Sequence, residues 1–253
     1  MELSELVDRL DDRLDTDAYS DVDASANGLQ VGPSEATVDH AAFAVDTAAA
    51  PIAAAADADA DLLVTHHGLS WGGIERVTDR EYDRIAALVD NDIALYVSHL
   101  PLDGHQELGN AAALADRLGL TDTEPFGTMG PVFVGQQGDA PASLTRAELT
   151  ATLESELEGE DVQVLDFGPA DIQQVAIVTG SGTDWLDEAR AAGADTLLTG
   201  EGKQQVYHRA REAGLNVILA GHYATETGGV QRLQELADDW GLSTSYHSHP
   251  TGL

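Results

Sequence analysis

The chain has 253 residues, 43% of them hydrophobic, and its 45 acidic residues outnumber 12 basic ones, which gives a formal net charge of -33. It contains no cysteine, which excludes disulfides, thiolate ligands and cysteine nucleophiles and leaves nitrogen and oxygen atoms to hold any metal. The shortage of Lys and Arg disfavours a nucleic-acid partner, because phosphate backbones are held by clustered basic side chains.

The distribution of charge indicates the salt concentration to which the protein is adapted. Acidic residues are spread over predicted helix faces, and Lys203 is the single lysine. Such an acidic coat suits very high salt, where repulsion between like charges is screened. We therefore expect a halophilic source, with an ordinary acidic protein as the alternative. The chain lacks a run of about eighteen apolar residues and a signal peptide, so we expect a cytoplasmic protein without a membrane span.

The first predicted element is an amphipathic helix at the amino terminus. Five apolar side chains recur there at helical spacing, with charged residues between them: Leu3, Leu6, Val7, Leu10 and Leu14. This period of about 3.6 residues predicts a helix that packs on a sheet through one face.

From residue 40 onward, short apolar runs alternate with helical patterns. Strands are predicted over residues 40–45, 61–65, 93–98, 131–135, 162–166, 173–179, 195–199 and 216–220. Helices are predicted over residues 79–90, 106–118, 145–158, 184–192, 203–213 and 225–240. Thr145 and Glu148 have the spacing of a capping box that opens one of these helices. Strands that alternate with helices predict an α/β fold with largely parallel sheet.

The sequence hints at two duplicated halves. Residues 60–67 (ADLLVTHH) resemble residues 194–201 (ADTLLTGE), and an apolar strand ending near a histidine follows each segment after a helix. Two related halves would present strand ends to one shared site; alternatively, any two βαβ units look alike. We place the halves at residues 1–125 and 126–253, with the Pro- and Gly-containing stretch 120–130 as their junction.

Three polar fragments follow predicted strands, where ligands gather in α/β sheets. The first contains His66 and His67. Neighbouring residues of an extended chain point to opposite sides, so two adjacent imidazoles approach two different ions more easily than a common one. Taken alone, such a pair is more often solvated or locally capped.

The other two fragments add carboxylates. If a helix begins directly after its strand, the i,i+4 spacing of His222 and Glu226 places both on one face, although this spacing is common by chance. Asp103 follows a third strand. A carboxylate that joins imidazoles suits a first-row divalent ion, with Asp103 as a terminal ligand and Glu226 able to bridge. Five ligands suffice for two adjacent ions if one carboxylate bridges and water fills the remaining positions.

Five motifs, spread over nearly the whole chain, resemble the GTP cyclohydrolase I type 2 homologs, also called the NIF-three-like dinuclear metal proteins. The motifs are Asn27-Gly28-Leu29-Gln30-Val31-Gly32, Thr65-His66-His67-Gly68, His99-Leu100-Pro101-Leu102-Asp103, Leu108-Gly109-Asn110 and Gly221-His222-Tyr223-Ala224-Thr225-Glu226. The resemblance implies two intertwined, three-layer α/β/α halves in the short form of the family, a homohexameric ring, and two divalent metal ions per chain. It further implies that His67, Asp103 and Glu226 hold one ion, while His66, His222 and Glu226 hold the other.

Several other residues compete for roles near such a centre. His99 can serve as a partner of a metal ligand or as a proton shuttle, and a structural histidine at a strand end is the alternative. Glu201 can orient a water or substrate, or simply supply a favourable charge at a helix start. Residues 180–183 (GSGT) can cradle an anion, although an ordinary turn is the simpler interpretation. Three further histidines receive no role: His105, His247 and His249.

Two functions fit these residues. A metal-dependent hydrolase would use the ions to activate water and the scissile group of a nucleotide or another phosphorylated small molecule. A non-enzymatic metal-handling protein or scaffold is the alternative, and a ring that encircles DNA is disfavoured by the charge. The family name suggests the purine ring of GTP as the target, but the sequence does not identify the acid–base residues that this reaction needs. We expect iron or zinc, and the same ligands accept Mn, Co or Ni.

Overall fold

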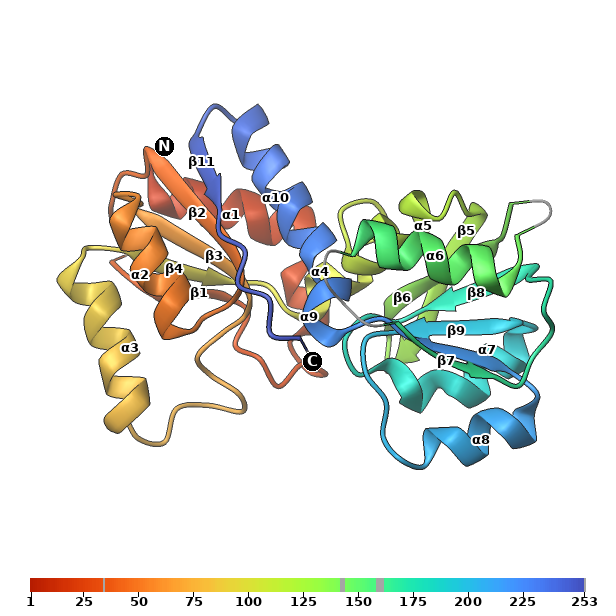
Figure 1. Ribbon diagram of the computed structural model, residues 1–253. Helices are drawn as coiled ribbons and strands as arrows, with labels where there is room; N and C mark the ends of the chain where they lie inside the picture. Colours follow the sequence, from red (N-terminus) through yellow and green to blue (C-terminus); the bar gives the residue numbers. More distant parts are fainter. Residues whose placement is uncertain (34, 142–143, 158–161, 253) are drawn as a thin grey trace. The chain divides into compact units, whose positions relative to one another are not determined.

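The computed structural model describes the chain except for residues 34, 142–143, 158–161 and 253 (Figure 1). The chain forms two compact units: unit 1 contains residues 1–102 and 230–249, and unit 2 contains residues 103–229 and 250–253. Each unit has its own sheet. Residue 125, the predicted boundary between halves, lies inside unit 2, and the duplication stays a prediction.

Unit 1 is built on a five-stranded sheet in the order β1-β4-β3-β2-β11. Its strands are β1 (Gly28–Val31), β2 (His40–Asp46), β3 (Leu62–His67), β4 (Ala94–Val97) and β11 (Ser243–Tyr246). β4, β3, β2 and β11 run parallel, and β1 pairs antiparallel with β4 at one edge. The carboxyl ends of β3 and β4 therefore meet at the same edge of the sheet.

Helices cover this sheet because its central strands, β2, β3 and β4, are largely buried on both faces. α2 (Ala49–Asp57) and α3 (Asp79–Asp90) pack on one face through Ile52 and Leu88. α1 (Leu3–Leu14) buries the leucines that predicted it, and its Asp11 accepts a 2.8 Å hydrogen bond from Tyr96 Oη on β4. Each fully buried leucine contributes roughly 1.5–3 kcal/mol of hydrophobic stabilisation, which makes α1 part of the core of unit 1.

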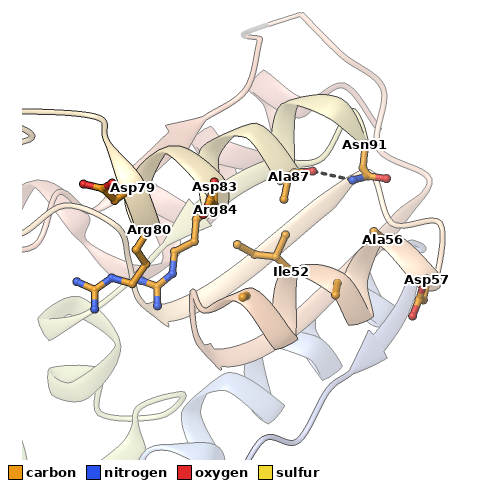
Figure 2. A pocket seen from close by; sticks show the side chains of 11 residues that line it. Ile52, Ala56, Asp57, Asp79, Arg80, Asp83, Arg84, Ala87 and Asn91 are labelled. Atoms are coloured by element: carbon orange, nitrogen blue, oxygen red, sulfur yellow. Dashed lines mark hydrogen bonds between the residues drawn. The ribbon is translucent and has the colours of Figure 1, made fainter.

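A cavity of about 610 Å³ lies between α2 and α3 (Figure 2). Ile52 and several alanines give it an apolar wall, while Arg80 and Arg84 extend in the same direction along one end. None of the predicted site residues lines this cavity. It is therefore separate from the metal ligands that the sequence predicts for unit 1.

Unit 2 is built on a six-stranded sheet in the order β5-β6-β8-β9-β10-β7. Its strands are β5 (Thr121–Met129), β6 (Val132–Asp139), β7 (Gln163–Asp166), β8 (Gln174–Ile177), β9 (Thr196–Thr199) and β10 (Asn216–Leu219). β8, β9 and β10 run parallel, and the other pairings are antiparallel. The α/β class is confirmed, but this sheet is mixed and not largely parallel.

The predicted junction between the halves contributes a strand to this mixed sheet. Within the stretch 120–130, residues 121–129 form β5, which a two-residue connection at Gly130 (φ 59°) joins to β6 as a hairpin. β5 lies at the edge of the sheet. An edge strand tolerates Pro125 because one side of it makes no ladder hydrogen bonds.

Helices lie on both faces of the sheet of unit 2 (Figure 1). α5 (Asn110–Arg117) and α6 (Arg146–Glu156) share one apolar cluster with β8, β9 and β10, and α7 (Leu186–Ala192) and α8 (Val206–Ala213) cover the other face. The predicted capping box of α6 is confirmed, since Thr145 Oγ1 accepts from the Glu148 N–H at 3.2 Å and the Thr145 N–H donates to Glu148 Oε2 at 2.9 Å.

The remaining elements are short or contain a boundary between the units. α4 (Leu100–Gly104) and α10 (Thr227–Asp239) each contain such a boundary. The short helix α9 (His222–Thr225) follows β10, and the 3-10 turns are η1 (Thr16–Tyr19) and η2 (Gly182–Trp185). Within the described ranges, no helix combines the length and the apolar character needed to cross a membrane.

Candidate metal centre

Unit 1 gathers three histidines beyond the carboxyl ends of β3 and β4. The ring centres of His66 and His67 are 4.6 Å apart, and those of His66 and His99 are 5.1 Å apart. One ring nitrogen from each of the three lies within 4.8 Å of the other two. Strand alternation fixes the direction of Cβ, but the rings of His66 and His67 lie side by side at the end of β3. They can therefore approach one common centre as well as two adjacent ones.

Hydrogen bonds fix which nitrogen His66 and His67 present. His66 Nδ1 lies 2.9 Å from the carbonyl oxygen of Ser98, and His67 Nδ1 lies 2.8 Å from Asp46 Oδ1. A carbonyl oxygen only accepts, so His66 Nδ1 must carry the proton and leave Nε2 as the ligand atom. An oxygen acceptor behind the far ring nitrogen is the usual partner of a metal-binding histidine.

His99 is fixed in the same way by a larger group of hydrogen bonds. Its Nδ1 lies 2.9 Å from Oδ1 of Asp23, and its backbone N–H donates to Asn27 Oδ1 at 2.8 Å. Asp23 also accepts from the backbone N–H groups of Ser25 and Leu100 and from Asn27 Nδ2, each at 2.9 Å. The motif that begins at Asn27 therefore helps to hold His99 in place.

Asp23 stays ionised although its side chain is only 1% exposed. Burial raises the pKa of the Asp23 carboxyl, but the hydrogen bonds from His99, Asn27 and Ser25 outweigh it and hold the pKa below its ordinary value. An ionised carboxylate can only accept, so His99 Nδ1 donates and its Nε2 is presented toward solvent or a ligand. Asp23 was not among the residues predicted from the sequence.

Unit 2 brings together the histidine and the glutamate that i,i+4 spacing predicts. His222 Nε2 lies 3.3 Å from Glu226 Oε1, and His222 Nδ1 lies 3.1 Å from Glu201 Oε1. The hydrogen bond to Glu226 raises the pKa of His222 to about 9; burial opposes this rise, and Glu201 adds to it. Glu201 thus contacts the imidazole of His222 at Nδ1. A cation at Nε2 would replace the proton that the metal-free pair retains.

A second carboxylate of unit 2 lies close to Glu226. Asp103 and Glu226 are 7% and 3% exposed, and a carboxylate oxygen of one lies within 4.8 Å of one of the other. Asp103 Oδ1 accepts from Asn110 Nδ2 at 2.8 Å and from Thr179 Oγ1 at 2.9 Å. Two buried carboxylates at this separation repel each other, and a divalent cation relieves that repulsion. The donor set therefore fits a metal.

The backbone of Gly180 lies directly against the side chains of His222 and Glu226. Gly180 has φ 57°, and a Cβ atom there would overlap Glu226 Oε1 and stand 3.1 Å from His222 Nε2. Its carbonyl oxygen accepts from the N–H groups of Gly200 and Glu201, both at 2.9 Å. The glycine of the GSGT run is thus required for close approach, and the run continues into the 3-10 turn η2.

Known proteins resemble this chain over nearly its whole length. The family model described as Duf34/NIF3 (NGG1p interacting factor 3) matches residues 1–247. The chain belongs to the Duf34/NIF3 family. A relative from the halophile Halobacterium salinarum, named GTP cyclohydrolase 1 type 2 homolog, is 57% identical over 255 residues and covers 100% of both chains. A protein of the same name from Deinococcus radiodurans is 40% identical over 98% of this chain and 94% of its own. The resemblance found in the sequence is confirmed.

Solved structures of similar proteins share the fold of this Duf34/NIF3 chain over its whole length. The protein ybgI, whose function is given as unknown, is 35% identical with a TM-score of 0.91, and a protein from Thermus thermophilus is 38% identical with a TM-score of 0.91. Both matches cover 100% of each chain. The relative from Halobacterium agrees with the halophilic source expected from the acidic composition.

Two of the three histidines that received no predicted role make local contacts in the Duf34/NIF3 chain. His105 Nδ1 accepts from the N–H groups of Glu107 and Leu108 and so closes a turn. His247 Nε2 lies 3.0 Å from Ser245 Oγ, and burial lowers the pKa of His247. His249 follows β11 in unit 1.

Proposed function

We propose that this protein binds two adjacent divalent metal ions, with iron or zinc favoured and Mn, Co or Ni also accepted, through five side chains: His66, His67, Asp103, His222 and Glu226. The observation that carries this proposal is the anchoring of the imidazoles. Oxygen acceptors hold Nδ1 of His66, His67 and His222, so the protein fixes Nε2 as the ligand atom before any metal arrives.

The arrangement within unit 2 supports Glu226 as the bridging ligand. Glu226 lies beside Asp103 as well as His222, so a candidate ligand of each ion lies next to this one carboxylate. The family resemblance assigns His67, Asp103 and Glu226 to one ion and His66, His222 and Glu226 to the other. Five side chains give each of two ions three protein ligands only if one carboxylate is shared between the ions.

We propose that this centre makes the protein a metal-dependent hydrolase of a nucleotide or another phosphorylated small molecule. Divalent ions in such a site supply Lewis-acid activation of water and of the scissile group. The protein's own contribution includes His99, whose Nε2 can take up or release a proton because the Asp23 carboxylate fixes its Nδ1–H. The relatives' name, GTP cyclohydrolase 1 type 2 homolog, makes GTP the first substrate to test.

The test of this function is turnover by the metal-loaded protein in molar KCl. A panel of nucleotides and phosphoesters is incubated with wild type and with His67→Ala and Glu226→Ala, one substitution in each unit. We expect both variants to lose turnover, while the matched control His105→Ala retains it. A loaded wild type that hydrolyses no member of the panel supports the alternative, a non-enzymatic metal-handling protein or scaffold.

We also propose that the protein assembles as a homohexameric ring in the cytoplasm and takes a small molecule as its partner. The family resemblance supports the ring, and the net charge of -33 argues against nucleic acid. Light scattering in molar KCl is expected to give six times the mass of the chain, and a monomer would exclude the ring.

A further inference from the structure

Unit 1 alone contains an arrangement suited to one metal ion. Three imidazoles that share one ion, each with its ligand nitrogen about 2.1 Å from the metal, have ring centres roughly 4.5 to 6 Å apart for angles at the metal of about 90° to 130°. The ring centres of His66, His67 and His99 are separated by 4.6, 5.1 and 5.8 Å. Their ligand atoms lie within 4.8 Å of one another. The cluster thus has the dimensions of a three-nitrogen site.

The anchors of the three rings favour coordination at one point. Ser98 O, Asp46 and Asp23 each hold one Nδ1, which leaves three Nε2 atoms at the end of the sheet. Carboxylates behind His67 and His99 fix the orientation of the rings and offset the charge of a cation. The Asp23 side chain is buried and has four hydrogen-bond partners. It therefore holds the His99 ring in one orientation, as a metal ligand requires.

We propose that unit 1 by itself binds one divalent cation through Nε2 of His66, His67 and His99, without Asp103, His222 or Glu226. Three imidazoles with open coordination positions suit zinc, cobalt, nickel or copper. The inference rests on the proposed metal-binding function and extends it, because it makes His99 a ligand. One Nε2 atom cannot hold an ion and accept a proton at once. The three-histidine site is therefore an alternative to the complete centre, and we call it the loading site.

The experiment removes the ligands of unit 2 from the full chain and uses Co²⁺ alone as the probe. A triple variant, Asp103→Asn with His222→Ala and Glu226→Gln, is dialysed against Co²⁺ in molar KCl. Bound cobalt is measured by elemental analysis and visible absorption. We expect one Co²⁺ per chain. His99→Ala in the triple variant is expected to abolish this binding, and Asp23→Asn to weaken it about 10- to 100-fold.

Two controls keep the outcome decisive. His105→Ala in the triple variant removes a histidine outside the cluster and should leave cobalt binding unchanged. Asp23→Asn is nearly isosteric, so it still reports on His99 if His99→Ala fails to fold. A triple variant that binds no cobalt, or that binds it equally after the His99 and Asp23 substitutions, overturns the proposal.

The loading site and the hydrolase can fail separately. A wild type that holds two ions, alongside a triple variant that holds none, removes the loading site and leaves the paired centre standing. A triple variant that holds one ion through His99, alongside a wild type without turnover, removes the hydrolase and leaves the loading site standing.

Discussion

The two units contribute ligands of different electrostatic character. Unit 1 presents three imidazoles at the ends of parallel strands, each held at Nδ1 by an oxygen atom. Unit 2 presents two buried carboxylates, Asp103 and Glu226, with His222 beside them. Anchored imidazoles are stable without a cation, whereas close carboxylates need a proton or a metal between them. Unit 2 should therefore depend on metal more strongly than unit 1.

The largest effect is expected from filling the space at Gly180. Gly180→Ala forces a Cβ into Glu226 and into positive φ, which should cost roughly 2 to 5 kcal/mol of unfolding free energy and displace a ligand carboxylate. Gly214 is the matched control in unit 2, because it has φ 65° and open space where a Cβ would stand.

Denaturant unfolding and metal stoichiometry distinguish the two glycine variants. Gly214→Ala should lose only the roughly 1 to 2 kcal/mol of left-handed strain and keep its metal. Equal losses in both variants would show that crowding against Glu226 does not matter.

Removal of metal should reduce the stability of unit 2 more than that of unit 1. At a free metal concentration of 100 times Kd, binding stabilises the folded state by about 2.7 kcal/mol. Amide hydrogen exchange after chelation should show that loss in residues 180 and 222–229 of unit 2, with smaller changes in β3 of unit 1. Equal loss of protection in both units would contradict the comparison.

In the metal-free protein, the protection of unit 2 should also depend on pH. The pKa of His222 is raised to about 9, so its contribution to stability is complete below its ordinary pKa and is lost as pH rises through about 9. The protection factors of residues 222–229, in which the intrinsic rise of exchange with pH is divided out, are expected to fall over that range only when metal is absent. A pH profile that metal does not change would remove this explanation.

The smallest effects concern the anchors of unit 1. Asp23→Asn should cost about 1 to 3 kcal/mol, because Asp23 is buried and accepts four hydrogen bonds. Asp46→Asn should cost less than about 1 kcal/mol, because Asp46 is a third exposed. The lowered pKa of Asp23 makes its contribution present above its ordinary pKa and lost as pH falls through the lowered value. Unfolding free energies of the two variants at neutral and acid pH test this order.

Local patterns predicted much of this structure. The helix over 79–90 has the predicted bounds, and the strand-end rule found the fragments that contain His66, Asp103 and His222. The same rule would also have selected Asp46 at the end of β2, but Asp46 was not among the predicted site residues. α2 was missed because a run of alanines gives no contrast between faces.

What the sequence could not supply depends on long-range contacts. Asp23 meets His99 across 76 residues, and no periodicity marks either partner. β11 pairs with β2 from the other end of the chain. Gly180 looked like a turn residue because its crowding comes from Glu226, which lies two strands later in the sequence.

The most direct measurement is elemental analysis combined with anomalous scattering on protein purified without chelator or affinity tag. We predict two divalent ions per chain, with His67, Asp103 and Glu226 around one and His66, His222 and Glu226 around the other. One ion per chain, or none at these five residues, would contradict the paired centre.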